Sequence, residues 1–79
     1  MVIKILGTGC PNCLKLEEQA KKAAQELNVN AEFVKVKEID KILEYGIART
    51  PGLVIDEMVK SSGRIPTVDQ IKTFIQESM

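Results

Sequence analysis

The sequence contains no histidine and no tryptophan, and only two of its 79 residues are cysteines. Without imidazole there is no Cys–His catalytic pair, so acid–base chemistry must come from a thiol, a carboxylate, a lysine or the backbone. A closed mononuclear zinc site needs about four nitrogen or sulfur ligands. Two thiols supply half of such a site, which would need carboxylates or a second subunit to be complete.

The sequence also lacks an excess of charge of one sign, because lysine plus arginine and aspartate plus glutamate both total 11. A formal net charge of zero provides no basic field for nucleic acid, and we expect no nucleic-acid partner. The apolar runs span only a few residues, and the segment MVIKILG is too short and too interrupted by Lys4 for a signal peptide. We therefore expect no membrane association and a cytoplasmic location, where a close cysteine pair is more often catalytic or metal-binding than structural.

The chain has room for one domain, which covers 1–79 and buries only roughly 60% of the surface of the unfolded chain. The residue patterns predict strands at 2–6, 31–39, 53–56 and 58–62, and helices from Pro11 to Asn28, over 41–46 and from Thr67 onward. The order is β-α-β-α-β-β-α, with a helical crossover between the first two strands and a tight turn at Asp56-Glu57 between the last two. This order predicts an α/β sandwich with a mixed, four-stranded sheet.

The first helix is predicted by a single apolar stripe, which consists of Cys13, Leu16, Ala20, Ala23 and Leu27. The pairs Glu17 with Lys21 and Glu18 with Lys22 have the favourable i,i+4 order and are expected on the opposite face. Asn28 is a suitable left-handed end for this helix.

Capping residues indicate where the other two helices begin. Asp40 is expected to cap the short helix KILEYG, which ends at Gly46. Thr67 and Gln70 form the T-x-x-Q pattern of a capping box. The helix that follows is expected to carry four apolar residues inward, namely Val68, Ile71, Phe74 and Ile75.

The segment GTGCPNC (7–13) places both cysteines on the predicted turn from strand to helix. Because a residue before proline avoids the helical region, Cys10 is expected to be extended at the N-cap, and Pro11 takes the first helical position. The turn residues Gly9, Pro11 and Asn12, the amides of Asn12 and Cys13 and the positive end of the helix dipole would then stabilise a Cys10 thiolate. A cysteine in this setting has its pKa lowered from about 8.5 to roughly 3.5–7.5.

Cys13 opens the apolar stripe, so it is expected to face the core and to keep a higher pKa than Cys10. This asymmetry suits thiol–disulfide exchange, in which an accessible thiolate attacks a substrate disulfide and a second thiol resolves the mixed disulfide. The alternative for Cys13 alone is a small buried hydrophobe, since free cysteine is among the most buried residue types. A CxxC pair on a strand-to-helix turn of a βαβ unit favours the redox interpretation.

Three segments of the chain resemble the thioredoxin-like fold: the strand–GTGCPNC–helix opening, the later ARTPGLVID and the closing helix. The resemblance covers the whole chain and is strongest to the glutaredoxin-like small redox-active disulfide proteins. It implies that Cys10 is the nucleophile, that Cys13 resolves, and that the redox-active disulfide between them is the only cofactor. It also implies that Pro51 is a cis-proline facing the cysteine pair and that Thr50 offers backbone hydrogen bonds to an extended substrate segment. Chain physics alone would make Pro51 trans, since only about 5–6% of X–Pro bonds in folded proteins are cis.

The sequence departs from the family pattern at several positions. Gly9 stands where thioredoxins carry a tryptophan, and the residues between the cysteines are Pro-Asn. Glutaredoxins hold glutathione with a glycine-rich turn and a nearby acidic residue. At that place this chain has Ser61-Ser62-Gly63-Arg64. The electron donor is therefore as plausibly a flavoprotein reductase or another dithiol protein as glutathione. Arg49 has two interpretations, a cation near Cys10 or a solvated surface charge.

Two other functions compete with the redox interpretation. Copper(I) chaperones also carry a CxxC pair after the first strand, and thiolates suit that ion. However, their domains end in a strand and favour a methionine before the motif, where this chain has Gly7-Thr8-Gly9. A non-catalytic interaction module with a thioredoxin-like fold is the other alternative. The sequence favours a thiol–disulfide oxidoreductase that acts on disulfide-containing proteins.

Overall fold

The computed structural model describes residues 1–9 and 11–79. Its elements are β1 (Val2–Leu6), α1 (Pro11–Glu26), β2 (Glu32–Val36), α2 (Ile39–Glu44), β3 (Gly52–Ile55), β4 (Met58–Ser62) and α3 (Val68–Glu77). The order is the one that the sequence predicts. In the described part of the chain, no helix is long and apolar enough to cross a membrane.

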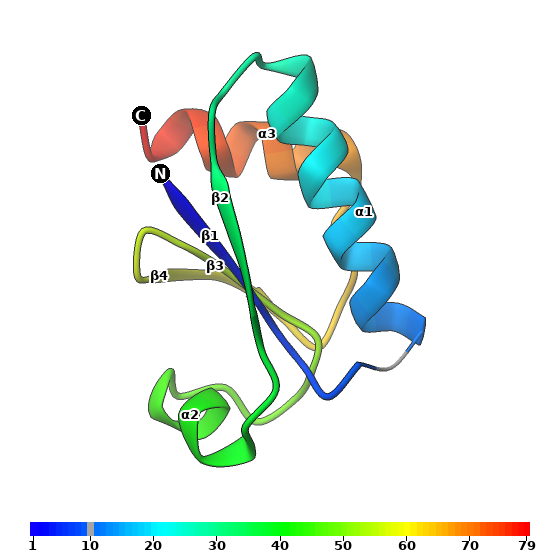
Figure 1. Cartoon of the computed structure of the whole chain (residues 1–79), viewed down its shortest axis with the longest axis vertical. Coiled ribbons are helices and arrows are strands. Elements are labelled where there is room, and N and C mark those ends of the chain that lie inside the picture. Colours follow the sequence, from blue (N-terminus) through cyan, green and yellow to red (C-terminus); the bar gives the residue numbers. More distant parts are fainter. Residues whose placement is uncertain (10) are drawn as a thin grey trace.

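The four strands form one mixed sheet in the order β2-β1-β3-β4. β1 and β2 are parallel, as the helical crossover between them predicts, and β3 is antiparallel to both β1 and β4. Figure 1 shows α1 and α3 side by side on one side of the sheet and α2 on the other. The predicted α/β sandwich is therefore confirmed.

Two apolar clusters lie on the two faces of this sheet, because side chains of a strand alternate between its faces. On the α1 and α3 side the buried cluster consists of Ile3, Ile5, Leu16, Ala20, Ala23, Ala24, Leu53, Ile55, Ile71 and Ile75. On the α2 side the smaller cluster consists of Leu6, Val36, Ile42, Ile47 and Val54. All residues of β3 are buried, as expected for a strand covered on both faces.

The helix ends follow the predicted capping chemistry in most places. Asn28 has a φ of 56°, the left-handed conformation predicted for the end of α1. The Thr67 hydroxyl accepts a hydrogen bond from the Gln70 amide at 3.2 Å, and the Gln70 side chain accepts one from the Thr67 amide at 2.9 Å. Ile71 and Ile75 are fully buried, whereas Val68 and Phe74 are partly buried against the same cluster.

The region between β2 and α2 differs from the prediction. β2 ends at Val36, not at Ile39, because its partner β1 ends at Leu6 and offers no further ladder. Ile39 is the first residue of α2, so Asp40 lies within the first turn instead of at the cap. The N-cap residue is Glu38, whose side chain makes no capping hydrogen bond. Asp40 still suits this position, since a carboxylate in the first turn is favoured by the helix dipole.

Candidate functional site

The register of the sheet brings three distant segments to one end of the molecule. Leu6, the last residue of β1, lies opposite Val36 of β2 and opposite Gly52 of β3. Beyond these last paired residues, the amide of Gly7 donates one more hydrogen bond to the Val36 carbonyl at 2.9 Å. The turn after β1, the residue after β2 and the residue before β3 are consequently neighbours in space.

Gly7 is the residue against which Cys13 packs. A Cβ atom at Gly7 would overlap Sγ of Cys13, and it would lie 3.2 Å from Cβ of Cys13 and 3.9 Å from Cβ of Thr50. A residue without a side chain at this position therefore lets Cys13 approach the strand end and brings it close to Thr50. This role of Gly7 was not predicted from the sequence, where the one available signal is a glycine between the predicted strand and the cysteine motif.

The turn residues lie at the start of α1 as predicted. Gly9 is exposed and has a φ of 93°, a conformation that L side chains rarely adopt. Pro11 and Asn12 are exposed and occupy the first two positions of α1. Cys10, with its predicted extended N-cap conformation, lies outside the described residues.

Cys13 is the third residue of α1 and faces the interior, as the apolar stripe predicts. It is 5% exposed and is disulfide-bonded in the structure. Its position on the first turn, directly over Gly7, keeps its sulfur on the strand side of the helix.

Thr50 lies near Gly7 and directly precedes Pro51 and β3. The Thr50–Pro51 peptide bond is cis, which confirms the expectation that came from the family resemblance. Pro51 is buried and its carbonyl accepts a hydrogen bond from the Gly63 amide at 2.9 Å, whereas Thr50 is exposed.

Arg49 packs against the loop after β4. Its Cβ and Cδ atoms would lie 3.1 and 3.3 Å from a Cβ atom at Gly63. The residue as a whole is exposed. Its aliphatic stem therefore covers Gly63, which agrees with the interpretation of Arg49 as a surface residue. The alternative interpretation involves Cys10 and falls outside the described residues.

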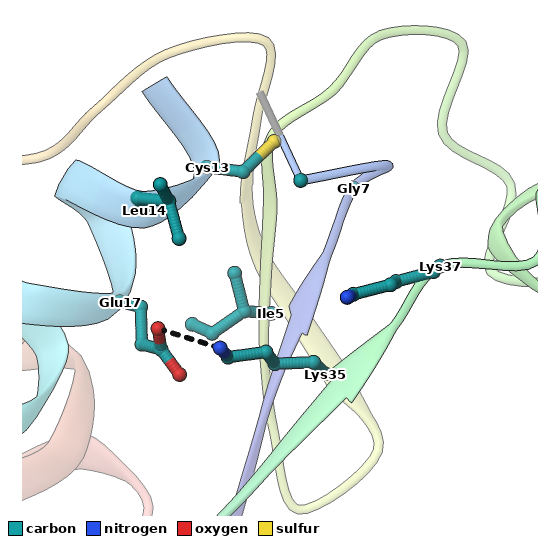
Figure 2. A pocket seen from close by; sticks show the side chains of 8 residues that line it. Ile5, Gly7, Cys13, Leu14, Glu17, Lys35 and Lys37 are labelled. Atoms are coloured by element: carbon teal, nitrogen blue, oxygen red, sulfur yellow. Dashed lines mark ion pairs between the residues drawn. The ribbon is translucent and has the colours of Figure 1, made fainter. Parts of the chain in front are cut away.

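A pocket of about 130 Å³ opens beside Cys13, between α1 and the β1–β2 edge of the sheet (Figure 2). Its lining residues are Ile5, Gly7, Gly9, Cys13, Leu14, Glu17, Lys35 and Lys37. Leu14 is 50% exposed, so the pocket has one apolar side chain that also faces solvent. The cysteine turn and the end of β2 thus share one cavity.

The position of Glu17 differs from the one predicted for the first helix. The sequence pattern predicts Glu17 on the face opposite the apolar stripe, but it is only 9% exposed and lies on the side of α1 that faces the sheet. The reason is its position beside the stripe residue Leu16, above β2. Its Oε1 lies 3.2 Å from Lys35 Nζ, and its Oε2 lies 3.5 Å from Lys21 Nζ, so the predicted pair with Lys21 forms.

The second predicted helix pair does not form. Glu18 and Lys22 are exposed as expected, but no ion pair joins them in the described part of the chain.

Residues 1–9 and 11–79 contain no group of three histidine, cysteine, aspartate or glutamate side chains that could hold a metal ion.

The chain resembles known proteins over nearly its whole length. The thioredoxin domain family matches residues 1–76. A protein named Thioredoxin from Methanothermobacter thermautotrophicus is 47% identical over 75 residues, which are 95% of this chain and 97% of that protein. Another Thioredoxin, from Methanocaldococcus jannaschii, is 44% identical over 72 residues, which are 91% of this chain and 83% of that protein. With the strand-to-helix cysteine turn and its neighbouring proline, these matches show that the chain belongs to the thioredoxin family.

Proposed function

We propose that Cys10 and Cys13 form the dithiol–disulfide couple of this thiol–disulfide oxidoreductase. Membership of the thioredoxin family makes the chain a thioredoxin-like redox protein. The observation that best supports the proposal for this pair is the close packing of Cys13 against Gly7, with Thr50 beside it. A buried second thiol on the first turn of α1 is suited to resolving, since it is kept from external disulfides until the first thiol has reacted.

The proposed reaction has two exchange steps. The Cys10 thiolate attacks one sulfur of a substrate disulfide, the substrate S–S bond breaks, and one substrate sulfur leaves with the electron pair. The Cys13 thiolate then attacks Cys10 Sγ in the mixed disulfide, the bond to the substrate breaks, and the second substrate thiolate leaves. The substrate gains two electrons, and the protein ends as the Cys10–Cys13 disulfide.

The turn residues have supporting roles in this proposal. Gly9, Pro11 and Asn12 shape the helix start, and the amides of Asn12 and Cys13 stabilise the Cys10 thiolate. Thr50 and Pro51 position an extended segment of the substrate beside the cysteines. The exposure of Thr50 next to the buried Pro51 supports this role.

The partners of the proposed reaction are disulfide-containing proteins and an electron donor. A flavoprotein reductase or another dithiol protein is as suitable a donor as glutathione. No cofactor beyond the Cys10–Cys13 disulfide is required, because exchange between thiols and disulfides moves the electrons through the sulfur atoms themselves. We assign this activity to the cytoplasm.

The test is turnover of a model protein disulfide with dithiothreitol as the electron donor. We expect the wild type to accelerate reduction and Cys10→Ser to abolish the acceleration. Cys13→Ser, first reduced and then mixed with the protein disulfide after removal of dithiothreitol, should accumulate a mixed disulfide that mass spectrometry detects. Lys22→Gln, an exposed substitution on α1, should keep wild-type turnover. Equal activity of wild type and Cys10→Ser would overturn the proposal.

A further inference from the structure

The pocket beside Cys13 has two lysines on one wall. Lys35 is the register partner of Ile5, whose side chain belongs to the cluster on the α1 side, so Lys35 also points to that side. Lys37 follows two residues later, directly after β2, and lines the same pocket. Figure 2 shows the ammonium group of Lys37 pointing into the cavity between Gly7 and Lys35.

The charges of this pocket are not balanced. Its lining contains one carboxylate, Glu17, and two ammonium groups, Lys35 and Lys37. Both Glu17 oxygens are engaged, one by Lys35 at 3.2 Å and the other by Lys21 at 3.5 Å. Lys37 takes part in no ion pair or hydrogen bond in the described part of the chain. The pocket therefore has one ammonium group available to an incoming anion.

Lys37 lies close to the turn that carries the proposed redox pair. Gly7 donates to the carbonyl of Val36, the residue before Lys37, and Gly7 also packs against Cys13. A substrate segment attached through its own cysteine at this turn would place neighbouring side chains over the pocket. The volume of about 130 Å³ is ample for a carboxylate group, since one water needs about 10–15 Å³ of such space.

We propose that this pocket is a substrate subsite that takes the carboxylate of an acidic residue next to the substrate cysteine, with Lys37 as its partner. The inference rests on the proposed function and adds to it the chemistry of the preferred substrate. Lys37 is a specificity residue here, because it touches the substrate beside the reacting atoms and takes no part in the exchange itself. One partly exposed ion pair changes an equilibrium or a rate only modestly, so we expect about a threefold to fivefold preference.

The test uses two short peptides whose single cysteine is activated as a 2-pyridyl disulfide and is flanked on both sides by glutamate or by glutamine. The reduced protein attacks the peptide sulfur, the bond to the pyridine sulfur breaks, and the release of thiopyridone is followed by absorbance under single-turnover conditions. The wild type should react about threefold to fivefold faster with the glutamate peptide at low ionic strength. The preference should weaken in about 1 M salt, where charges are screened within about 3 Å.

Two charge-reversal variants separate the pocket from the net charge of the protein. Lys37→Glu should invert the preference, so that the glutamine peptide reacts faster. Lys22→Glu makes the same change of net charge on an exposed part of α1 and should keep the wild-type preference. Lys37→Gln removes the charge of the subsite and should therefore react with both peptides at similar rates.

Failure of this inference differs from failure of the proposed function. If the wild type releases thiopyridone from both peptides at equal rates, the subsite does not exist, but the redox function stands. An equal loss of preference in Lys37→Glu and Lys22→Glu also overturns the subsite, because the effect would then come from net charge. If neither peptide reacts with the wild type but both react with dithiothreitol, the proposed function fails together with the subsite.

Discussion

The two faces of the sheet hold their charged side chains in different ways. On the α2 side, Lys4 donates to Tyr45 Oη at 2.8 Å and pairs with Glu57 Oε1 at 2.5 Å, and its ammonium lies 5.5 Å from the Tyr45 ring centroid. On the α1 side, the pocket beside Cys13 contains two lysines and one carboxylate. The lysine on the first face has all its interactions within the protein, whereas Lys37 on the second face has an ammonium group available for a ligand.

This difference indicates that the Lys4 network has a structural role and the pocket beside Cys13 a functional one. The hydrogen bond from Lys4 holds the pKa of Glu57 below its ordinary value, and the same bond raises the pKa of Lys4 well above its ordinary range. Both groups reach solvent, so the network joins β1 to the β3–β4 turn without forming a closed site. Substitutions on the α2 side should therefore change stability, and substitutions around the pocket should change reactivity.

The largest expected effect concerns the two apolar clusters. Ile71 is fully buried in the larger cluster, and Ile42 is 4% exposed in the smaller one. Truncation of a buried isoleucine to alanine destabilises by about 2–5 kcal/mol, depending on how far the site can collapse. We expect Ile71→Ala in the upper half of that range and Ile42→Ala in the lower half, as measured by urea denaturation. Equal losses would show that the two faces contribute alike.

Substitution of Gly7 should have an intermediate effect on stability and should also slow the exchange reaction. Gly7→Ala puts a Cβ atom onto Cys13 Sγ, and overpacking of this kind destabilises by about 1–3 kcal/mol. Because the atom that must move is the resolving sulfur, we expect the mixed disulfide with substrate to persist longer than in the wild type. Ile42→Ala is the control for lost stability, and a similar delay in both variants would contradict a specific role for Gly7.

The smallest expected effect is the pH dependence of the Lys4–Glu57 pair. The folded pKa of Glu57 is depressed, so its stabilising contribution is present above the unfolded pKa of about 4.3 and is lost as pH falls through the folded pKa. The folded pKa of Lys4 is raised, so its contribution is present below about 10.4 and is lost as pH rises through the folded pKa. Lys4→Met should flatten both limbs of the stability–pH curve slightly while leaving disulfide turnover unchanged. Unchanged limbs would show that the pair adds nothing to stability.

Local patterns in the sequence were sufficient for most of the fold. The stripe from Cys13 to Ala23, the left-handed Asn28 and the Thr67–Gln70 capping box each depend on residues within a few positions, so they could be predicted without a tertiary structure. The end of β2 could not be predicted in this way, because β2 ends where β1 ends and no longer offers it a partner. An apolar residue such as Ile39 then continues a strand pattern although it begins a helix.

In the candidate site, too, the features set by neighbouring residues could be predicted and those set by the tertiary structure could not. The cysteine turn is local and was apparent from GTGCPNC, whereas the cis bond before Pro51 came only from the family resemblance. The pocket depends on the parallel register that sets Lys35 beside Ile5, and Lys37 and Gly7 line the same pocket. The prediction for the face of Glu17 is wrong, because a helical pair with Lys21 does not reveal that a second lysine approaches from the sheet.

The most direct test of the proposed redox pair is the thiolate titration of Cys10, followed by ultraviolet absorbance in a Cys13→Ser variant. The variant retains a single thiol, so the absorbance change reports one group. If the helix start stabilises the thiolate, the pKa of Cys10 will lie well below the ordinary value of about 8.5. A pKa at or above that value would contradict the account, because the turn would then supply no activated nucleophile.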